Sequence, residues 1–295
     1  MFKLFLCTTA ALMTLPANAA EPTRFTVVTV GKGPDVILIP GLSSPRAVWS
    51  RTAERLKATH RVHLVQLKGF GEPAGPNASG PVLQPFVDEL GAYIVAQKMR
   101  RPAIVGHSMG GLAALMIATD RPALPGKVMV VDALPFIGPL FGASSIEAIR
   151  PMADRMRTML MSNAATTAPD FSPPDCPDTL PAPASPRGNM TNSGAGACLV
   201  RYGAAASDLR VVASAMHDDM VTDLTPRLKA ITAPVTMLYP QDDRLLTAAA
   251  AAKIYRDAYA GLPAAKLVPI TGSYHFIMQD QPAKFASQLD SFLNR

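Results

Sequence analysis

The sequence contains little charge and shows no clustering of the charge that it has. Charged residues make up 17% of the 295 residues and hydrophobic residues 48%, which is typical of a globular chain and argues against a disordered one. The formal net charge is +6, but Lys and Arg are scattered, without a dense basic stripe or interleaved aromatic residues. We therefore interpret the charge as a solubility property and expect no nucleic-acid partner.

The sequence also lacks an apolar stretch long enough to span a membrane. Its N-terminal apolar run, from Leu4 to about Leu15, is too short for a transmembrane helix. The run follows Lys3 and precedes the small residues Ala17-Asn18-Ala19, which is the arrangement of a secretory signal with its cleavage site. We expect residues 1–19 to be a signal peptide, the mature protein to be periplasmic or secreted, and no stable membrane anchor to remain.

Cysteine is scarce, and only Cys176 and Cys198 remain once the predicted signal, with the third cysteine, is removed. An exported protein meets an oxidising compartment, where disulfides persist. Both cysteines lie in the most proline-rich part of the chain, where a cross-link would reduce the chain entropy most. We expect a Cys176–Cys198 disulfide, with two separate thiols as the alternative. Neither a metal site nor a cofactor site is predicted.

Continuous apolar runs alternate with helical patterns in the first half of the chain. An alternating stretch at residues 23–33 ends in glycines and is typical of an antiparallel edge strand. The next runs are typical of strands buried on both faces, and helical stretches lie between them. Such alternation predicts right-handed crossovers on a parallel sheet, that is, an α/β fold. The four runs are Asp35–Pro40, Arg61–Leu67, 102–106 and Lys127–Val131.

The alternation stops at Ala133 and resumes after about Thr232. Between them lie a Met-rich helical pattern, a loop dense in Pro and Ser, and further helical stretches. A structureless loop of that length is uncommon in a compact domain. We therefore predict a helical cap at 133–232, inserted into a core formed by 20–132 and 233–295.

The segment Gly106-His107-Ser108-Met109-Gly110 joins a predicted buried strand to a predicted helix. The pattern G-x-S-x-G in this context predicts a nucleophile elbow, in which a strained turn exposes the serine. The flanking glycines are needed because the chain on either side of the serine approaches itself closely. Ser108 is therefore the candidate nucleophile, and an ordinary strand-to-helix turn is the alternative.

A general base for Ser108 is expected late in the chain, and His275 is the histidine that fits. It follows the last predicted strand and precedes the closing helix. His60 and His63 are interpreted as surface or packing residues, and His107 as a packing residue that points away from Ser108. His217 lies beside two aspartates, but consecutive helical residues point in different directions, so a metal site is not predicted there.

The acid that orients His275 is expected on the loop after the strand at 233–240, which contains Asp242 and Asp243. We predict Asp243 from its spacing, although Pro240 stands where a glycine is usual, and Asp242 and Asp132 remain alternatives. Such a carboxylate holds the imidazole tautomer and stabilises the imidazolium. The unused aspartate is expected to be a turn or N-cap residue.

A tetrahedral intermediate also requires two backbone N–H donors. Met109, directly after the serine, supplies one. The loop after the Asp35–Pro40 strand supplies the other, from Leu42, and Gly41 permits the tight turn.

The chain order Ser108, Asp243, His275, together with the elbow, the Pro40–Ser44 loop and the insertion after the fourth buried strand, resembles the α/β-hydrolase family. The resemblance implies a mostly parallel sheet flanked by helices with an inserted cap. A serine at the elbow argues against the dehalogenase and epoxide-hydrolase branches, which use aspartate there.

We therefore expect a serine hydrolase that cleaves carboxylic esters of small to medium apolar substrates through an acyl-enzyme, without a cofactor. Hydrolysis of another acyl or C–C bond (lactone, amide, diketone) and a non-catalytic binding protein are the alternatives. A stripe of Ile149, Met152, Met156, Met159 and Leu160 in the cap either packs the cap on the core or forms an adaptable apolar wall above Ser108.

Overall fold

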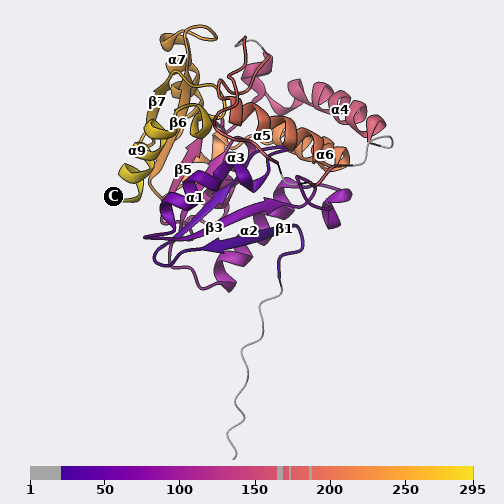
Figure 1. Ribbon diagram of the computed structural model, residues 1–295. Helices are drawn as coiled ribbons and strands as arrows, with labels where there is room; N and C mark the ends of the chain where they lie inside the picture. Colours follow the sequence, from indigo (N-terminus) through magenta and orange to yellow (C-terminus); the bar gives the residue numbers. More distant parts are fainter. Residues whose placement is uncertain (1–20, 165–168, 173, 186–187, 295) are drawn as a thin grey trace, which may run out of the picture.

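A seven-stranded sheet forms the centre of the protein (Figure 1). The computed structural model describes residues 21–164, 169–172, 174–185 and 188–294, so the predicted signal peptide lies outside the described residues. The strand order is β1-β3-β2-β4-β5-β6-β7, in which β1 is antiparallel to β3 and all other neighbours are parallel. The predicted α/β fold and its antiparallel edge strand are confirmed. The strands are Phe25–Val30, Asp35–Ile39, Arg61–Leu67, Ala103–His107, Lys127–Val131, Val235–Gln241 and Lys266–Thr271.

Helices cover both faces of the sheet because successive side chains of a buried strand point to opposite faces. On β2, Ile37 and Ile39 belong to the apolar layer that also includes residues of α2, α3 and α7, whereas Val36 and Leu38 belong to the layer that includes residues of α1 and α9. The resulting two apolar layers explain why these strands are continuously hydrophobic. The helices are α1 (Ser50–Leu56), α2 (Leu83–Ala96), α3 (Met109–Asp120), α7 (Ala248–Ala258), α8 (Ile277–Asp280) and α9 (Pro282–Leu293).

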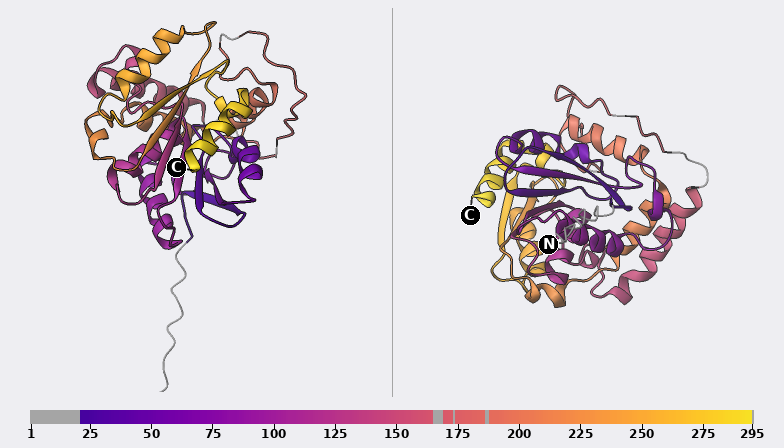
Figure 2. Two further views of the ribbon diagram at one scale, coloured as in Figure 1. Left: turned by 90° about the vertical axis from the view of Figure 1, so that its left-hand side faces the viewer. Right: turned by 90° about the horizontal axis from the view of Figure 1, so that it is seen from below.

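Between β5 and β6, the described residues form helices and loops and no strand of the sheet. The helices are α4 (Ile146–Asn163), α5 (Gly194–Ala205) and α6 (Leu209–Met220), and they gather beyond one end of the sheet (Figure 1). The described parts of the connection between α4 and α5 run along the outside of the molecule (Figure 2). Short 3-10 turns at Gly138–Phe141 and Thr225–Ala230 join this segment to the core.

The methionine stripe of α4 packs mainly against α6. Ile149 is buried, and Met152 and Met156 lie against the same small apolar cluster, which includes Met220 of α6. Met159 is 56% exposed. The packing interpretation of the stripe therefore describes most of it.

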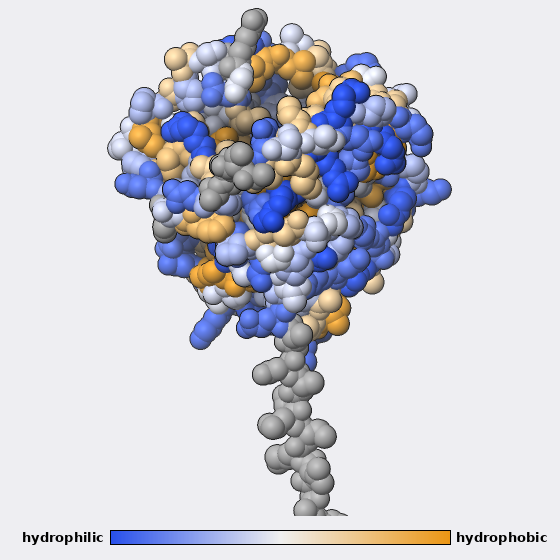
Figure 3. All heavy atoms as spheres, turned by 90° about the vertical axis from the view of Figure 1, so that its right-hand side faces the viewer, coloured by the Kyte–Doolittle hydropathy of each residue, from blue (hydrophilic) through white to orange (hydrophobic). Residues whose placement is uncertain are grey.

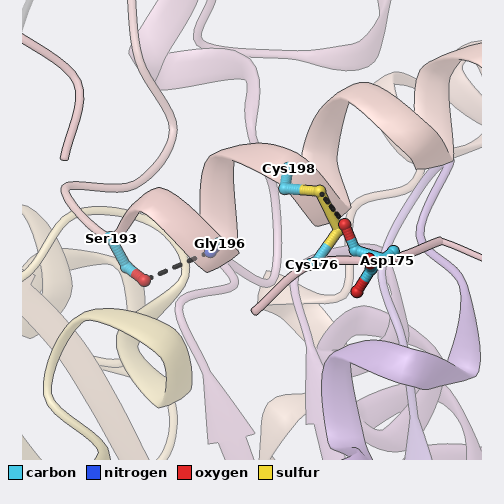
Figure 4. Close-up of a disulfide and its surroundings, with 5 residues drawn as sticks. All are labelled: Asp175, Cys176, Ser193, Gly196 and Cys198. Atoms are coloured by element: carbon cyan, nitrogen blue, oxygen red, sulfur yellow. Dashed lines mark hydrogen bonds between the residues drawn. A yellow bond between two sulfur atoms is a disulfide. The ribbon is translucent and has the colours of Figure 1, made fainter. Parts of the chain in front are cut away.

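A disulfide joins Cys176 to Cys198 of α5, as predicted (Figure 4). The first half of α5 is thereby tied to the proline-rich connection that precedes it. The other end of that connection is held by Asp280, whose carboxylate accepts the Asn192 N–H at 3.0 Å and the Tyr274 N–H at 2.7 Å. These bonds fix the start of α5 next to the loop that carries His275.

The face shown in Figure 3 presents apolar residues in small groups separated by polar ones. Across the described residues, none of the helices is long and apolar enough to cross a membrane.

Candidate active site

Ser108 occupies the turn between β4 and α3 with a strained backbone, φ 53° and ψ −128°. Positive φ is uncommon for a residue with a side chain and costs conformational energy. The turn is possible only with glycine on both sides: a Cβ on Gly106 would lie 2.1 Å from the carbonyl oxygen of Gly110, and one on Gly110 would lie 2.5 Å from that of Ile39. The sequence pattern therefore does form the strained strand–turn–helix geometry of a nucleophile elbow.

His275 lies on the loop after β7, with its Nδ1 atom 2.6 Å from Oδ2 of Asp132. Asp132 is the first residue after β5, where its N–H donates to the Leu238 carbonyl at 2.8 Å. The side chains of His275 and Asp132 are 22% and 12% exposed. The second carboxylate oxygen of Asp132 accepts a hydrogen bond from the Tyr255 hydroxyl. Both oxygens of this carboxylate are thus engaged, one by the imidazole and one by a phenol.

The predicted pairing of Asp243 with His275 is therefore wrong in this structure. Oδ1 of Asp243 accepts a hydrogen bond from Gln241 Nε2 at 2.9 Å instead. Asp242, the other candidate on this loop, binds the guanidinium and the N–H of Arg244, which lowers the pKa of the carboxyl. Asp242 is a turn residue, as expected for an aspartate not used for catalysis, but the N-cap of α7 is Thr247.

His107 lies beneath His275 and is completely buried. Its Nε2–H donates to the His275 carbonyl oxygen at 3.0 Å, and the two ring centroids are 4.5 Å apart. Because a carbonyl can only accept, Nε2 bears the proton. Burial holds the pKa of His107 well below its usual value, so the ring is neutral. His107 thus packs away from Ser108 and supports the backbone of His275.

The two segments expected to supply the oxyanion donors, the start of α3 and the loop that contains Leu42, both lie next to Ser108. Met109 is the first residue of α3, whose N-terminal N–H groups have no partner within the helix. The loop with Leu42 also lies against the serine, since a Cβ on Gly41 would be 2.8 Å from the Ser108 Cβ. Gly41 is thus required for the close approach of this loop to the elbow.

Ser108, Asp132 and His275 all line one cavity of about 160 Å³. Among the described residues, Ser108 Oγ makes no hydrogen bond. The hydrogen bond between a nucleophile and its general base is often long or poorly aligned before substrate binds. None of the described residues that line the cavity is Lys or Arg, and most of its wall is apolar. No residue of α4 lines it, so the α4 stripe does not form the wall above Ser108. The apolar lining residues are Met109, Leu112, Ala133, Leu134, Ile137 and Leu140.

Two further cavities help to place this one. Leu134 and Leu140 also line a neighbouring cavity of about 390 Å³, so apolar side chains separate two adjacent spaces. A cavity of about 600 Å³ lies between β1 and α2 and contains none of the predicted site residues. The chemistry is therefore centred on the smaller cavity at the carboxyl ends of the parallel strands.

Two polar residues that line the cavity, Tyr255 and Asp219, were not predicted as site residues from the sequence. Tyr255 projects from α7 into the cavity, and its burial beside Asp132 raises its pKa well above the usual value. Asp219 lines the cavity from α6, and burial raises its pKa to about 7. The helical spacing Val212, Ala215, Asp219 signals that Asp219 lies on the buried face, since the first two are buried apolar residues.

The described residues include no group of three or more His, Cys, Asp or Glu placed to hold a metal ion. The neighbours of Asp219 in the sequence have other partners. His217 Nε2 lies 3.0 Å from Asp154 Oδ1, and Asp218 accepts the backbone N–H groups of Val82 and Leu83 at 2.7 and 3.0 Å.

A model of the alpha/beta hydrolase family matches residues 36–288. Similar proteins include a pimeloyl-[acyl-carrier protein] methyl ester esterase of Vibrio atlanticus, 26% identical over 90% of this chain and 96% of that protein. The protein of the same description from Aliivibrio salmonicida is 27% identical over 90% of this chain and 94% of its own length.

Solved structures share the fold at lower identity. An enol-lactonase of Burkholderia xenovorans superposes with a TM-score of 0.68 at 18% identity, covering 92% of this chain and 96% of that one. A thermophilic esterase of Thermogutta terrifontis gives a TM-score of 0.69 at 18% identity, covering 93% and 97%.

Proposed function

The chain belongs to the α/β-hydrolase family, as an esterase-type serine hydrolase, and from that premise we propose that it cleaves carboxylic esters of small to medium apolar substrates through an acyl-enzyme on Ser108, His275 and Asp132. The observation that carries the proposal is the His275–Asp132 pair, which shares a cavity with a serine held in an elbow. Asp132 thus takes the role first assigned to Asp243.

The hydrogen bond from His275 Nδ1–H to Asp132 leaves Nε2 as the unprotonated nitrogen. Nε2 takes the Ser108 proton while Oγ attacks the ester carbonyl, and returns it to the leaving alcohol as the C–O bond breaks. A water molecule then loses its proton to Nε2 and attacks the acyl-enzyme, which releases the acid and restores Ser108. The Asp132 carboxylate stabilises the imidazolium in both steps.

The negative charge of each tetrahedral intermediate is received by the backbone N–H groups of Leu42 and Met109. Both lie beside Ser108, and Met109 begins a helix whose N-terminal dipole favours an anion. Preformed donors need no reorganisation during the reaction, so they lower the barrier more than mobile side chains would.

The substrate class is inferred from the cavity wall. Apolar side chains cover most of it, and the neighbouring cavity beyond Leu134 and Leu140 offers room for a larger apolar group. The relatives act, by their descriptions, on a methyl ester, which makes methyl esters a sensible first substrate series. We also propose export, which the Cys176–Cys198 disulfide supports because disulfides persist in oxidising compartments.

The test is labelling with a fluorophosphonate, which reacts with an activated serine, followed by turnover of methyl esters with graded acyl chains. We expect labelling of the wild type, none of Ser108→Ala, and a fall in kcat of about 10⁶-fold in that variant. Equal labelling of both proteins would overturn the assignment of Ser108. Labelling without ester turnover, but with turnover of lactones or amides, would change the substrate class and keep the mechanism.

A further inference from the structure

Asp219 is a second carboxyl group in the catalytic cavity, and the proposed mechanism does not use it. It projects from α6 into the space that Ser108 and His275 also line. Apart from the groups of the triad and the Tyr255 hydroxyl, it is the one ionisable side chain among the described residues of that lining. It is therefore the polar group that a bound substrate would meet in an otherwise apolar wall.

Asp219 differs from Asp132 in its hydrogen bonding. The Asp132 oxygens are held by His275 and Tyr255, whereas the Asp219 carboxyl makes no hydrogen bond or ion pair with the described residues. Asp219 is partly buried in the wall of this cavity. A carboxyl that is partly withdrawn from water and has no protein partner is available to a hydrogen-bond donor of a bound ligand.

We propose that the Asp219 carboxyl binds a hydrogen-bond donor of the substrate, a hydroxyl or an ammonium group close to the scissile ester, and disfavours substrates with a carboxylate there. The inference rests on the proposed ester hydrolysis and adds which polar group on the substrate the site prefers. Among the described lining residues there is no Lys or Arg to neutralise a substrate carboxylate, whereas a substrate ammonium group would form a charge-assisted hydrogen bond with Asp219.

The ionisation of Asp219 is governed by its surroundings on every side. Burial raises its pKa to about 7, the charge of Asp218 acts in the same direction, and His275 opposes them. The other titratable groups of the packed elements have partners: His217 pairs with Asp154 of α4, and Asp132 is bonded to Tyr255 of α7. Selection for an ammonium ester should therefore strengthen as pH rises through about 7, when the carboxyl becomes an anion.

The experiment compares kcat/KM for four methyl esters of similar size: methyl butanoate, methyl 3-hydroxypropanoate, methyl 3-aminopropanoate and monomethyl malonate. Wild type and Asp219→Asn are measured at pH 6 and pH 8. We expect the variant to lose at least about tenfold of the preference for the ammonium ester over methyl butanoate at pH 8, because a hydrogen bond to a charged group contributes that much. It should also accept the malonate ester better. Ratios between enzymes cancel the intrinsic reactivity of each ester.

Asp218→Asn is the matched control. It removes the same charge at the neighbouring residue, whose carboxylate does not line the cavity and instead accepts the N–H groups at the start of α2. It should leave the ester ratios at pH 8 as in wild type, because Asp219 is already an anion there and keeps its place in the cavity. Asp219→Ser, which also lacks the charge, should repeat the loss seen with Asp219→Asn. Unchanged ratios in both Asp219 variants, with methyl butanoate still hydrolysed, would overturn this inference alone. Absence of turnover by the wild type on all four esters, without fluorophosphonate labelling, would instead overturn the proposed function.

Thermal unfolding gives a readout that is independent of turnover. A carboxyl whose pKa is raised in the folded state makes the protein less stable as pH rises from about 4, the usual value, to about 7. Asp219→Asn should lack this contribution and gain in Tm relative to wild type more at pH 8 than at pH 5. The same difference at both pH values would contradict the unpaired, partly buried setting on which the inference depends.

Discussion

The loops that follow β5 and β6 both contain aspartate, yet only the aspartate of the first loop contacts His275. Asp132 lies one residue beyond β5 and meets Nδ1 of His275 at 2.6 Å. On the β6 loop, Asp242 is held by Arg244, and Asp243 by Gln241. The two loops thus differ in whether their carboxylate is free to serve the histidine or is already engaged by a cation or an amide of its own loop.

The comparison shows that two things select the acid of this site: how close the carboxylate lies to His275, and whether other side chains already bind it. β4 and β5 are neighbours, and the strand ladder continues past them, since Ser108 N–H donates to the Val131 carbonyl at 3.0 Å. This bond sets the elbow and Asp132 on adjacent strand ends. The β6 loop lies one strand farther from the serine, and its carboxylates turn toward their own loop.

The largest expected effect comes from Asp132→Asn. The amide would lose the negative charge that stabilises the imidazolium and could favour the wrong tautomer, so kcat should fall by about 10⁴-fold with a folded protein. Steady-state kinetics on methyl butanoate and circular dichroism of the variant check this. A loss below about tenfold would show that the β6 loop can supply the acid after all.

A smaller effect is expected from Tyr255→Phe, which removes the hydroxyl that binds the second oxygen of Asp132. One neutral-donor hydrogen bond to the carboxylate is lost, and we expect kcat to fall about tenfold with KM nearly unchanged. Because burial raises the pKa of Tyr255 well above 10, the phenol stays protonated, and the ratio of the two enzymes should be the same from pH 6 to pH 9. A ratio that changes with pH, or a change confined to KM, would argue against a positioning role.

The smallest effects are expected on the β6 loop. Asp243→Asn should leave kcat/KM within about twofold of wild type, since surface substitutions away from such networks have small consequences. Asp242→Asn should likewise spare activity but lower Tm slightly above pH 4, because Arg244 lowers the pKa of that carboxyl and favours its charged form in the folded protein. If Asp243→Asn were the more damaging of the three aspartate variants, the assignment of Asp132 would be wrong.

Much of the fold was predictable from sequence, because burial on two faces of a sheet leaves a plain apolar signature. The ranges Arg61–Leu67 and Lys127–Val131 agree with the predicted strands to the residue. Ser108 and His275 were also predictable, since the elbow demands glycines and the base follows the last strand. Side-chain partners were not: the partners of Asp132, Tyr255 and His275, lie more than 120 residues away in the chain, so nothing local to Asp132 marks it as the acid. The hydrogen bond from Gln241 that engages Asp243 is local, but its geometry is visible only in the folded loop.

The position of Asp132 has a consequence for the modularity of the enzyme. The nucleophile and the acid belong to one continuous stretch, β4-α3-β5, and only His275 comes from beyond the long insertion. An exchange or shortening of the helices between β5 and β6 would therefore leave the spacing of serine and aspartate unchanged. If the chain were divided within that insertion and expressed as two fragments, the first would carry Ser108 and Asp132 and the second His275, so neither would hold the whole triad. Ester hydrolysis by the mixed fragments would then measure their reassembly.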